Sequence, residues 1–379
     1  MDGFARDEYQ GRLQLVEAAL EQAGFDALIA YSVRNQPGPV AYLGGYEPDL
    51  GMHDVAFFVV APGARPRYAL LTNAFWDHPE ERTWAEVVIT SDFGARLTAL
   101  LPDSARRVGI AGYRCFPTPV YRALQTALPG TAFEDATPLL LEAARVKSAA
   151  EIAVMRRSMV MTDAAGRAFL ATVGEGANER EIQAEVERAL LGAGADRPAF
   201  SVQLYSGAQV AVGVGFRRDR TVARGEQVQV DCGALYRGYQ TELSRVTTVG
   251  RPTDGARAIM EATAQMYEAM LRTVGPGVPV AEVARVAIAT AKAQGMEPYL
   301  YRSPNHAGNF VGHGIGCWYH ESPEIHPDAK GTLEANMVIV LEPILGHPGV
   351  GGAKIEDPVL VTPYGAERLS GLEIRTWPA

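Results

Sequence analysis

Four carboxylates and one imidazole in the carboxy-terminal part of the chain have the residue types and the order of a metal-binding set. In chain order they are Asp231, Glu242, His313, Glu342 and Glu356. Four carboxylates can balance two divalent cations, and a mostly oxygen donor set favours Mn²⁺, Co²⁺ or Zn²⁺ over Cu(I) or an iron–sulfur cluster. Two such ions a few ångströms apart can generate hydroxide at neutral pH and polarise a carbonyl group. The set therefore predicts a hydrolytic metal centre.

The first two acids are expected on the two strands of a hairpin. Residues 226–233 alternate with period two, which places Asp231 on the same face as Gln227 and Gln229. Arg237-Gly238 is a turn signal, and residues 239–249 are expected to return as one strand that carries Glu242. Two paired strands can bring both carboxylates to one cation, although solvent-facing acids on strands are common without any metal.

The histidine lies in the segment Gly312-His313-Gly314-Ile315-Gly316, where glycines allow close backbone approach and leave the imidazole unshielded. No basic residue accompanies these glycines, which argues against a phosphate-binding loop. His320 follows, and Pro323 just after it argues against a helical zinc motif. Taken alone, the histidine would also fit a structural role.

The last two acids follow apolar or strand-like segments. Glu342 ends the apolar run 337–341, and burying an unpaired carboxylate costs several kcal/mol, so Glu342 must be paired, protonated or metal-bound. Glu356 is expected inside a strand, and Lys354 could neutralise one of the two acids. Each segment taken singly therefore also fits a structural ion pair, and the combination of five residues is what favours a metal site.

Two regions of the chain, with different patterns of expected helices and strands, must position these residues. In the amino-terminal part, a helix over 5–23 is expected to end at Gly24, and strand-like runs then alternate with helical segments at 92–101 and 118–128. The expected strands are 26–31, 55–61, 68–72, 87–90 and 108–111. This alternation is typical of an α/β domain, for which we expect the bounds 1–143.

A second domain is expected over 144–379, and it begins with long helices. Ser148 and Glu151 form a capping-box pattern that opens a helix to about Val173. Asn178 and Glu181 repeat that pattern for a second helix, which should end near Gly192. Two further helices are expected at about 254–273 and 280–294, and the remaining segments read as strands and tight turns.

Composition narrows the class of protein. Of the 379 residues, 44 are acidic and 35 are basic, which gives a formal net charge of −9 and argues against a nucleic-acid partner. No stretch approaches the roughly 20 apolar residues of a membrane helix, so no membrane association is expected. Three widely spaced cysteines show no disulfide framework, which favours a reducing, cytoplasmic compartment.

The five residues, their order and their neighbours resemble the M24-type metallopeptidase family that includes methionine aminopeptidase, prolidase and aminopeptidase P. The similarity includes Val-Asp-Cys-Gly-Ala, Gly-Tyr-Gln-Thr-Glu-Leu-Ser-Arg, Gly-His-Gly-Ile-Gly, Leu-Glu-Pro and Lys-Ile-Glu-Asp, and it spans about 150–365. The first 140 residues also resemble the accessory domain of the prolidase and creatinase branch. The resemblance implies an α+β fold in which a pita-bread catalytic domain follows a smaller α/β domain.

The same resemblance implies a function and a set of roles. The expected activity is metal-dependent hydrolysis of Xaa-Pro dipeptides or short peptides by a metal-bound hydroxide, in a chain that forms a homodimer. All five residues would ligate two divalent ions. Glu342 would also shuttle a proton, His320 would orient the substrate or stabilise the tetrahedral intermediate, and His306 and Lys354 would contact the substrate.

Four positions depart from the family pattern. Glu242 stands where the family usually has Asp, which is expected to weaken the second metal site, and Lys354 stands where it usually has Arg. Val214 and Asn309 stand where histidines normally assist the leaving amine and the oxyanion, and His306 or His53 could substitute for them. These departures leave two alternatives: a creatinase-like hydrolase of other C–N bonds, and a weakly catalytic or non-catalytic homologue.

Overall fold

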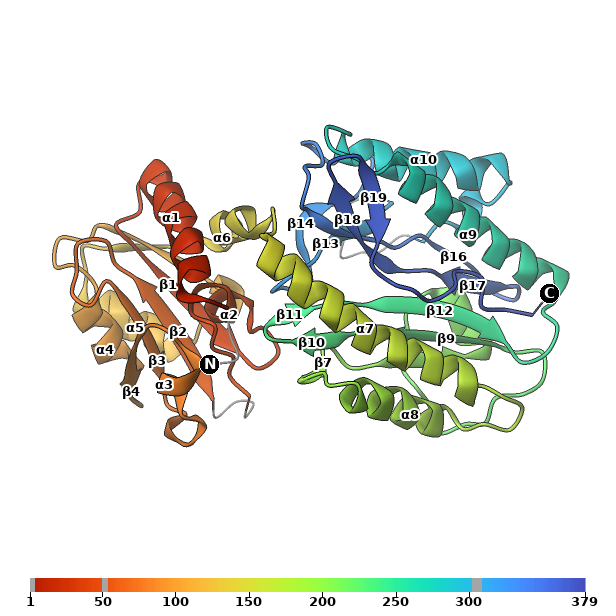
Figure 1. Ribbon diagram of the computed structural model, residues 1–379, viewed down its shortest axis with the longest axis horizontal. Coiled ribbons are helices and arrows are strands. Elements are labelled where there is room, and N and C mark those ends of the chain that lie inside the picture. Colours follow the sequence, from red (N-terminus) through yellow and green to blue (C-terminus); the bar gives the residue numbers. More distant parts are fainter. Residues whose placement is uncertain (1–3, 50–53, 302–308, 379) are drawn as a thin grey trace. The chain divides into compact units, whose positions relative to one another are not determined.

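The computed structural model describes residues 4–49, 54–301 and 309–378 (Figure 1). The chain divides into two compact units, Met1–Ala144 and Arg145–Ala379. Each unit has its own buried apolar clusters. None of the described helices is long and apolar enough to span a lipid bilayer.

The amino-terminal unit is built on a six-stranded mixed sheet with the strand order β4-β3-β2-β1-β5-β6. Its strands are β1 (Ala27–Val33), β2 (Val55–Val60), β3 (Tyr68–Thr72), β4 (Glu86–Ile89), β5 (Arg107–Ala111) and β6 (Ala132–Asp135). Strand β1 pairs antiparallel with β2 and parallel with β5, so that Ile29 lies opposite both Val59 and Ile110. These three side chains belong to the buried apolar core of the unit.

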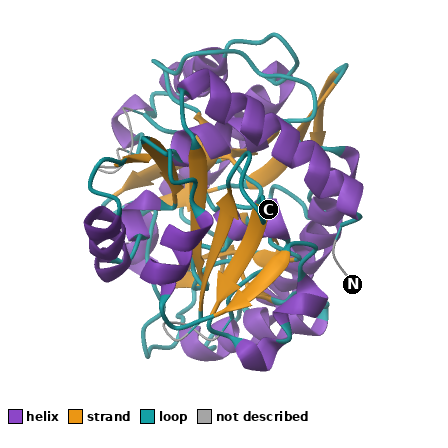
Figure 2. Ribbon diagram, turned by 90° about the vertical axis from the view of Figure 1, so that its left-hand side faces the viewer, coloured by secondary structure: helices purple, strands orange, loops and turns teal. Residues whose placement is uncertain are grey.

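Within the described residues of this unit, six α-helices accompany the sheet. Figure 2 distinguishes helices from strands by colour. They are α1 (Arg6–Ala23), α2 (Gly38–Gly44), α3 (Pro79–Arg82), α4 (Phe93–Leu100), α5 (Thr118–Ala127) and α6 (Thr137–Ala144). The expected first helix is confirmed, and it ends where Gly24 adopts the left-handed conformation at φ 72°. The short elements α2, α3, β6 and α6 were not expected from the sequence.

Four long helices support the carboxy-terminal unit. They are α7 (Ala149–Thr172), α8 (Glu179–Gly192), α9 (Asp254–Thr273) and α10 (Val280–Ala293). Figure 1 shows α7 beside α8 and α9 beside α10. The capping box of Ser148 and Glu151 is present in full. The second capping box is wrong, because the Asn178 side chain accepts from the N–H of Arg180 and not from Glu181.

The strands described for residues 145–301 and 309–378 form four small sheets with the orders β11-β10-β7, β12-β9-β8, β14-β13-β15-β18-β19 and β16-β17. Before the hairpin come β7 (Arg197–Pro198) and β8 (Gln203–Ser206), and the hairpin region holds β9 (Gln227–Cys232), β10 (Ala234–Tyr236), β11 (Tyr239–Gln240) and β12 (Leu243–Thr248). The remaining strands are β13 (Gly312–Gly314), β14 (Glu321–Glu324), β15 (Val338–Leu341), β16 (Ile344–His347), β17 (Gly351–Lys354), β18 (Asp357–Thr362) and β19 (Gly365–Arg368).

Two apolar clusters fix these sheets to the helices. Val228, Val230 and Cys232 of β9 pack with side chains of α7 and α8. Ile339 and Leu341 of β15 belong to a second cluster with side chains of α9 and α10. The opposite face of β9 carries Gln227, Gln229 and Asp231, and Glu342 directly follows β15.

Candidate metal centre

Asp231 lies on the polar face of β9, as the alternation predicts. The strand is buried along its whole length and pairs with β8 on one side and β12 on the other. The side chains of Gln227 and Gln229 on the same face reach β17 by hydrogen bonds. Asp231 is fully buried at the end of this row.

Glu242 does not lie within a continuous return strand, so that expectation is wrong. The turn at Arg237 and Gly238 forms with positive φ at both residues, but the returning chain is interrupted between β11 and β12. The interruption arises because β11 pairs with β10 whereas β12 pairs with β9, in a different sheet. Glu242 occupies the point where the chain passes from one sheet to the other, and its side chain is fully buried.

His313 sits in the middle of β13, between β14 and β15. A Cβ atom at Gly312 would lie 2.1 Å from the carbonyl oxygen of Val340, and one at Gly314 would lie 2.3 Å from that of Ser322, so both positions require glycine. His313 Nδ1 lies 2.8 Å from the carbonyl oxygen of Gly314. A carbonyl can only accept, so Nδ1 carries a proton, and Nε2 is the ring nitrogen that faces the acids of the site.

The last two acids enter from strand ends. Glu342 directly follows β15. Glu356 lies between β17 and β18 rather than inside one strand, which corrects that expectation. Its backbone forms an isolated antiparallel β-bridge with Ser244. Glu356 N donates to Ser244 O at 3.2 Å, and Ser244 N donates to Glu356 O at 3.1 Å.

Three of the predicted ligands converge. Glu242, His313 and Glu356 each offer one ligand atom, and these atoms lie within 4.8 Å of one another. His313 Nε2 is 3.1 Å from Glu242 Oε1 and 3.9 Å from Glu342 Oε2. Asp231 lies outside this group of three, although it belongs to the same buried charge cluster.

These residues pass a chemical test for metal binding. Among the described residues, Glu242 Oε2, Glu356 Oε1 and Asp231 Oδ1 are buried without a hydrogen bond or ion pair, whereas Glu242 Oε1 faces His313 Nε2 at 3.1 Å. Buried polar atoms are normally satisfied, because each unsatisfied one costs about 1–3 kcal/mol and more when it is charged. A cation bound between them would provide the missing partner, so the donor set fits a divalent metal.

Lys354 is the cation that the structure itself provides. Three carboxylate oxygens surround its Nζ: Asp231 Oδ2 at 2.8 Å, Glu342 Oε1 at 2.6 Å and Glu356 Oε2 at 3.1 Å. Only 5% of the lysine side chain is exposed. The predicted contact of Lys354 with substrate stays a prediction, and its three N–H bonds already face three acids.

The pKa values reflect an excess of buried negative charge. Burial raises the pKa of Asp231 to about 6, with Glu242 adding to the rise and Lys354 opposing it. Burial and the neighbouring Glu242 raise the pKa of Glu356 well above its usual value. Burial alone would lower the pKa of His313, but the carboxylates of Glu242 and Glu342 outweigh it and raise that pKa. Lys354 alone therefore leaves the acids under-neutralised.

His320 lies against the histidine of this group. The two imidazole rings are parallel within 11° and their centroids are 3.8 Å apart, with Phe310 stacked at 5.9 Å from the His320 ring. His320 is half-buried, whereas His313 is fully buried. The structure thus places the predicted catalytic histidine at the more open side of the predicted ligand.

The two positions that lack family histidines are both partly accessible. The side chain of Val214 is 40% exposed, and Asn309 is half-buried. His306 and His53, the expected substitutes, lie outside the described residues. The roles expected for these two histidines stay predictions.

Two sets of supporting residues were not expected from the sequence. The amides of Gln227 and Gln229 bind the backbone of Gly352 and Lys354.

Arg245 is fully buried and binds both carboxylate oxygens of Asp357 at 2.8 and 3.0 Å. Its Nη1 also donates to the carbonyl oxygen of Glu356 at 3.0 Å, which fixes the backbone beside that ligand. In the sequence, the polar residues Gln227, Gln229 and Arg245 within strand segments could have indicated both sets.

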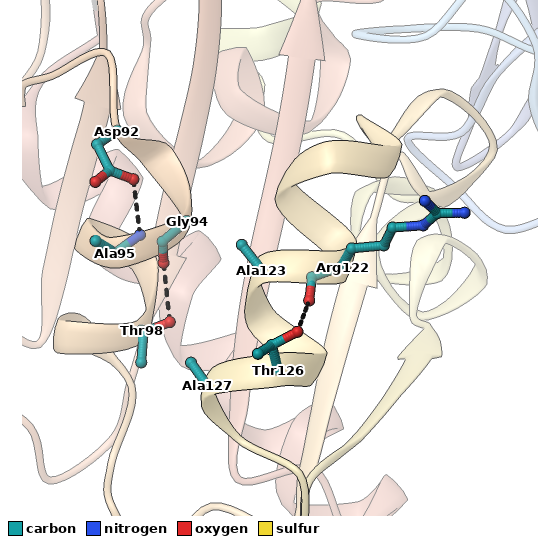
Figure 3. Close-up of a pocket in the computed structure, with 8 residues that line it drawn as sticks. All are labelled: Asp92, Gly94, Ala95, Thr98, Arg122, Ala123, Thr126 and Ala127. Carbon is teal, nitrogen blue, oxygen red and sulfur yellow. Dashed lines mark hydrogen bonds between the residues drawn. The ribbon is translucent and has the colours of Figure 1, made fainter.

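A surface pocket elsewhere holds none of these residues. It lies between α4 and α5 of the amino-terminal unit and has a volume of about 650 Å³ (Figure 3). Asp92 and Arg122 are its charged lining residues, and the Asp92 carboxylate already caps α4 by accepting from Ala95 N. The pocket shows no convergent set of catalytic groups.

Comparison with known proteins assigns both units. Residues 153–363 match the model of metallopeptidase family M24, and residues 12–147 match that of the creatinase/prolidase N-terminal domain. A Xaa-Pro dipeptidase of Pyrococcus furiosus is 33% identical over 228 residues, which are 60% of this chain and 64% of the relative. A Xaa-Pro dipeptidase of Pyrococcus horikoshii is 32% identical over 228 residues, which are 60% of this chain and 63% of the relative. The chain thus matches a little under two thirds of the length of these two relatives.

Solved structures extend the similarity over nearly the whole chain. The prolidase from Pyrococcus horikoshii OT3 superposes with a TM-score of 0.84 at 25% identity, covering 96% of this chain and 99% of that one. Together with the family matches, this confirms the predicted resemblance and the predicted α+β fold class, with a pita-bread unit after a creatinase-type unit.

Proposed function

Because the chain belongs to metallopeptidase family M24, we propose that it is a metal-dependent hydrolase of Xaa-Pro dipeptides or short peptides. Two relatives that carry the name Xaa-Pro dipeptidase support the substrate class. The observation that carries the proposal is the convergence of Glu242, His313 and Glu356, whose buried ligand atoms lie within 4.8 Å of one another. The family implies divalent metal binding, and these three side chains have the donor atoms for it.

We assign the ion-holding role to Glu242, His313 and Glu356, with Glu342 beside them. A bound divalent ion supplies a Lewis acid and a nucleophilic water at neutral pH. The oxygen-rich donor set favours Mn²⁺, Co²⁺ or Zn²⁺. The sequence further predicts two ions per chain, of which the second is held more weakly. It also predicts that Asp231 is a metal ligand.

Glu342 is the proposed proton carrier. Its Oε1 is held 2.6 Å from Lys354 Nζ, while its Oε2 faces His313 at 3.9 Å and makes no closer ion pair. The side chain is 9% exposed, the most accessible of the acids around Lys354. Oε2 can therefore take a proton from the attacking water and deliver it to the leaving amine.

His320 is the proposed stabiliser of the developing negative charge. Its ring stacks on His313 at a centroid distance of 3.8 Å, and the Phe310 ring lies 5.9 Å from both imidazoles. A preoriented N–H donor is most effective when the charge forms in a site that excludes water. The half-buried position of His320, stacked on the fully buried His313, supports this role.

The substrate class is tested on a panel of dipeptides. Protein that has been stripped with a chelator and reloaded with Mn²⁺, Co²⁺ or Zn²⁺ is expected to cleave Xaa-Pro dipeptides at least tenfold faster than the matching Xaa-Ala dipeptides. Equal rates on both series would remove the proline preference. No metal-dependent cleavage of any dipeptide would contradict the proposed activity. A cytoplasmic location and a homodimer remain predictions from the sequence.

A further inference from the structure

The ammonium of Lys354 has the surroundings of a bound metal ion. Its Nζ lies 2.6–3.1 Å from one oxygen each of Glu342, Asp231 and Glu356. All of these side chains are 9% exposed or less, so little solvent screens their charges. A lysine ammonium is a compact point charge with three donors, which resembles a small cation more closely than a planar guanidinium does.

The buried acids divide into two overlapping sets. Glu242 and His313 converge with Glu356 on one position. Asp231 and Glu342 converge with Glu356 on Lys354 Nζ. Glu356 belongs to both sets, just as a carboxylate shared by two neighbouring ions does in a dinuclear centre.

We propose that Lys354 is the resident second cation of this centre, so that the chain binds one divalent ion and not two. The inference rests on the proposed metal site and goes beyond it in assigning the second position to a side chain. The single ion takes the position between Glu242, His313 and Glu356. Asp231 is assigned to the lysine through its Oδ2, which lies 2.8 Å from Lys354 Nζ.

The backbone of Lys354 is held in place by Gln229 and by close packing of β17. Gln229 binds both Lys354 N and Lys354 O, at 3.1 and 3.0 Å. Two residues earlier, Gly352 passes so close to Val210 that a Cβ on Gly352 would lie 2.2 Å from the Val210 carbonyl oxygen. Because the ammonium lies 2.8 Å from Asp231 and 3.1 Å from Glu356, a second divalent ion that shared oxygens of these acids would be repelled by a positive charge within a few ångströms.

The test counts ions in the purified protein. Wild-type protein is incubated with excess Mn²⁺, desalted and analysed for manganese by mass spectrometry and by electron paramagnetic resonance. We expect one ion per chain and the signal of an isolated Mn²⁺. In Lys354→Met we expect two ions per chain and an exchange-coupled signal, because the cavity keeps its acids and loses its resident charge. Lys330→Met, an exposed lysine of the same unit, should keep one ion.

The outcomes separate this inference from the proposed function. Two ions in the wild type would overturn the inference and leave the proposed hydrolase intact. No specific ion in the wild type would contradict the metal site itself. A single ion in folded Lys354→Met would also overturn the inference.

A second variant serves if Lys354→Met does not fold. Asp231→Asn is expected to keep one ion with less than a tenfold loss of affinity, because Asp231 contacts the lysine rather than the ion. Loss of the ion in Asp231→Asn would overturn the assignment of Asp231.

Discussion

The side-chain amide of Gln229 binds both backbone groups of Lys354, since Nε2 donates to Lys354 O at 3.0 Å and Oε1 accepts from Lys354 N at 3.1 Å. The side-chain amide thus makes the pair of hydrogen bonds that a neighbouring strand would make, and so links β9 to β17. These two bonds set the position of Lys354 along β17 relative to Asp231, which follows Gln229 on the same face of β9. The geometry of the charged cluster is therefore set by a neutral side chain.

Gln229→Leu is expected to lower the free energy of unfolding of the carboxy-terminal unit by about 2–4 kcal/mol. Two buried backbone groups lose their partner, and each unsatisfied group costs about 1–3 kcal/mol. Urea denaturation measures the change, and the exposed Gln125→Leu in the other unit is the control. An unchanged midpoint in Gln229→Leu would show that the amide does not hold β17.

His313→Ala is expected to reduce hydrolysis at least 100-fold and to abolish tight metal binding, because it removes the nitrogen donor from the group of three. Loss of a direct ligand should exceed the 10–100-fold effect of changing a residue that only supports one. Calorimetric titration with Mn²⁺ checks the binding. His326→Ala, a half-buried histidine of the same unit, should behave as the wild type. Near-normal turnover in His313→Ala at saturating metal would place the site elsewhere.

Glu242→Asp tests whether the pocket has adapted to the longer side chain. Glu242 Oε1 already lies 3.1 Å from His313 Nε2, so shortening the side chain by one methylene withdraws the carboxylate from the group. We expect at least tenfold weaker metal binding by titration, with no change for the exposed Glu297→Asp. Tighter binding in Glu242→Asp would mean instead that the glutamate distorts an otherwise conventional site.

The stability of the metal-free protein should depend on pH through Asp231. Burial raises the pKa of this carboxyl from 3.8 to about 6, so between these values the folded state binds more protons than the unfolded state. The contribution of Asp231 to stability is therefore present below about pH 4 and is lost as the pH rises to about 6.

Thermal unfolding of chelator-treated protein from pH 4.5 to 7 checks this dependence. Relative to the wild type, Asp231→Asn should gain stability as the pH rises, whereas the exposed Asp328→Asn should follow the wild type. Parallel curves for wild type and Asp231→Asn would rule out a raised pKa at this position.

Local patterns predicted much of the fold. The capping box at Ser148, the left-handed stop at Gly24 and the alternation of β9 depend on residues a few positions apart, and all three are confirmed. The return strand that carries Glu242 was predicted as continuous because alternation does not reveal a change of sheet. The short elements of the amino-terminal unit lack the length that makes a periodic pattern visible.

The contacts within the candidate site could not be predicted in the same way. Lys354 was expected to neutralise one acid, whereas its ammonium contacts three. The bonds from Gln229 to Lys354 join residues 125 positions apart, and no local pattern encodes such a pairing. The residue types therefore indicated the chemistry of the site. Which acids surround the ion position and which surround Lys354 could be seen only in the folded structure.

An anomalous difference map from crystals grown with Mn²⁺ would locate the bound ion directly. We expect a peak about 2.0–2.3 Å from ligand atoms of Glu242, His313 and Glu356, a distance range typical of divalent ions with nitrogen and oxygen donors. We also expect Lys354 Nζ, and no second peak, between Asp231 and Glu342. A peak remote from His313, or no peak in the carboxy-terminal unit, would contradict the proposed metal centre.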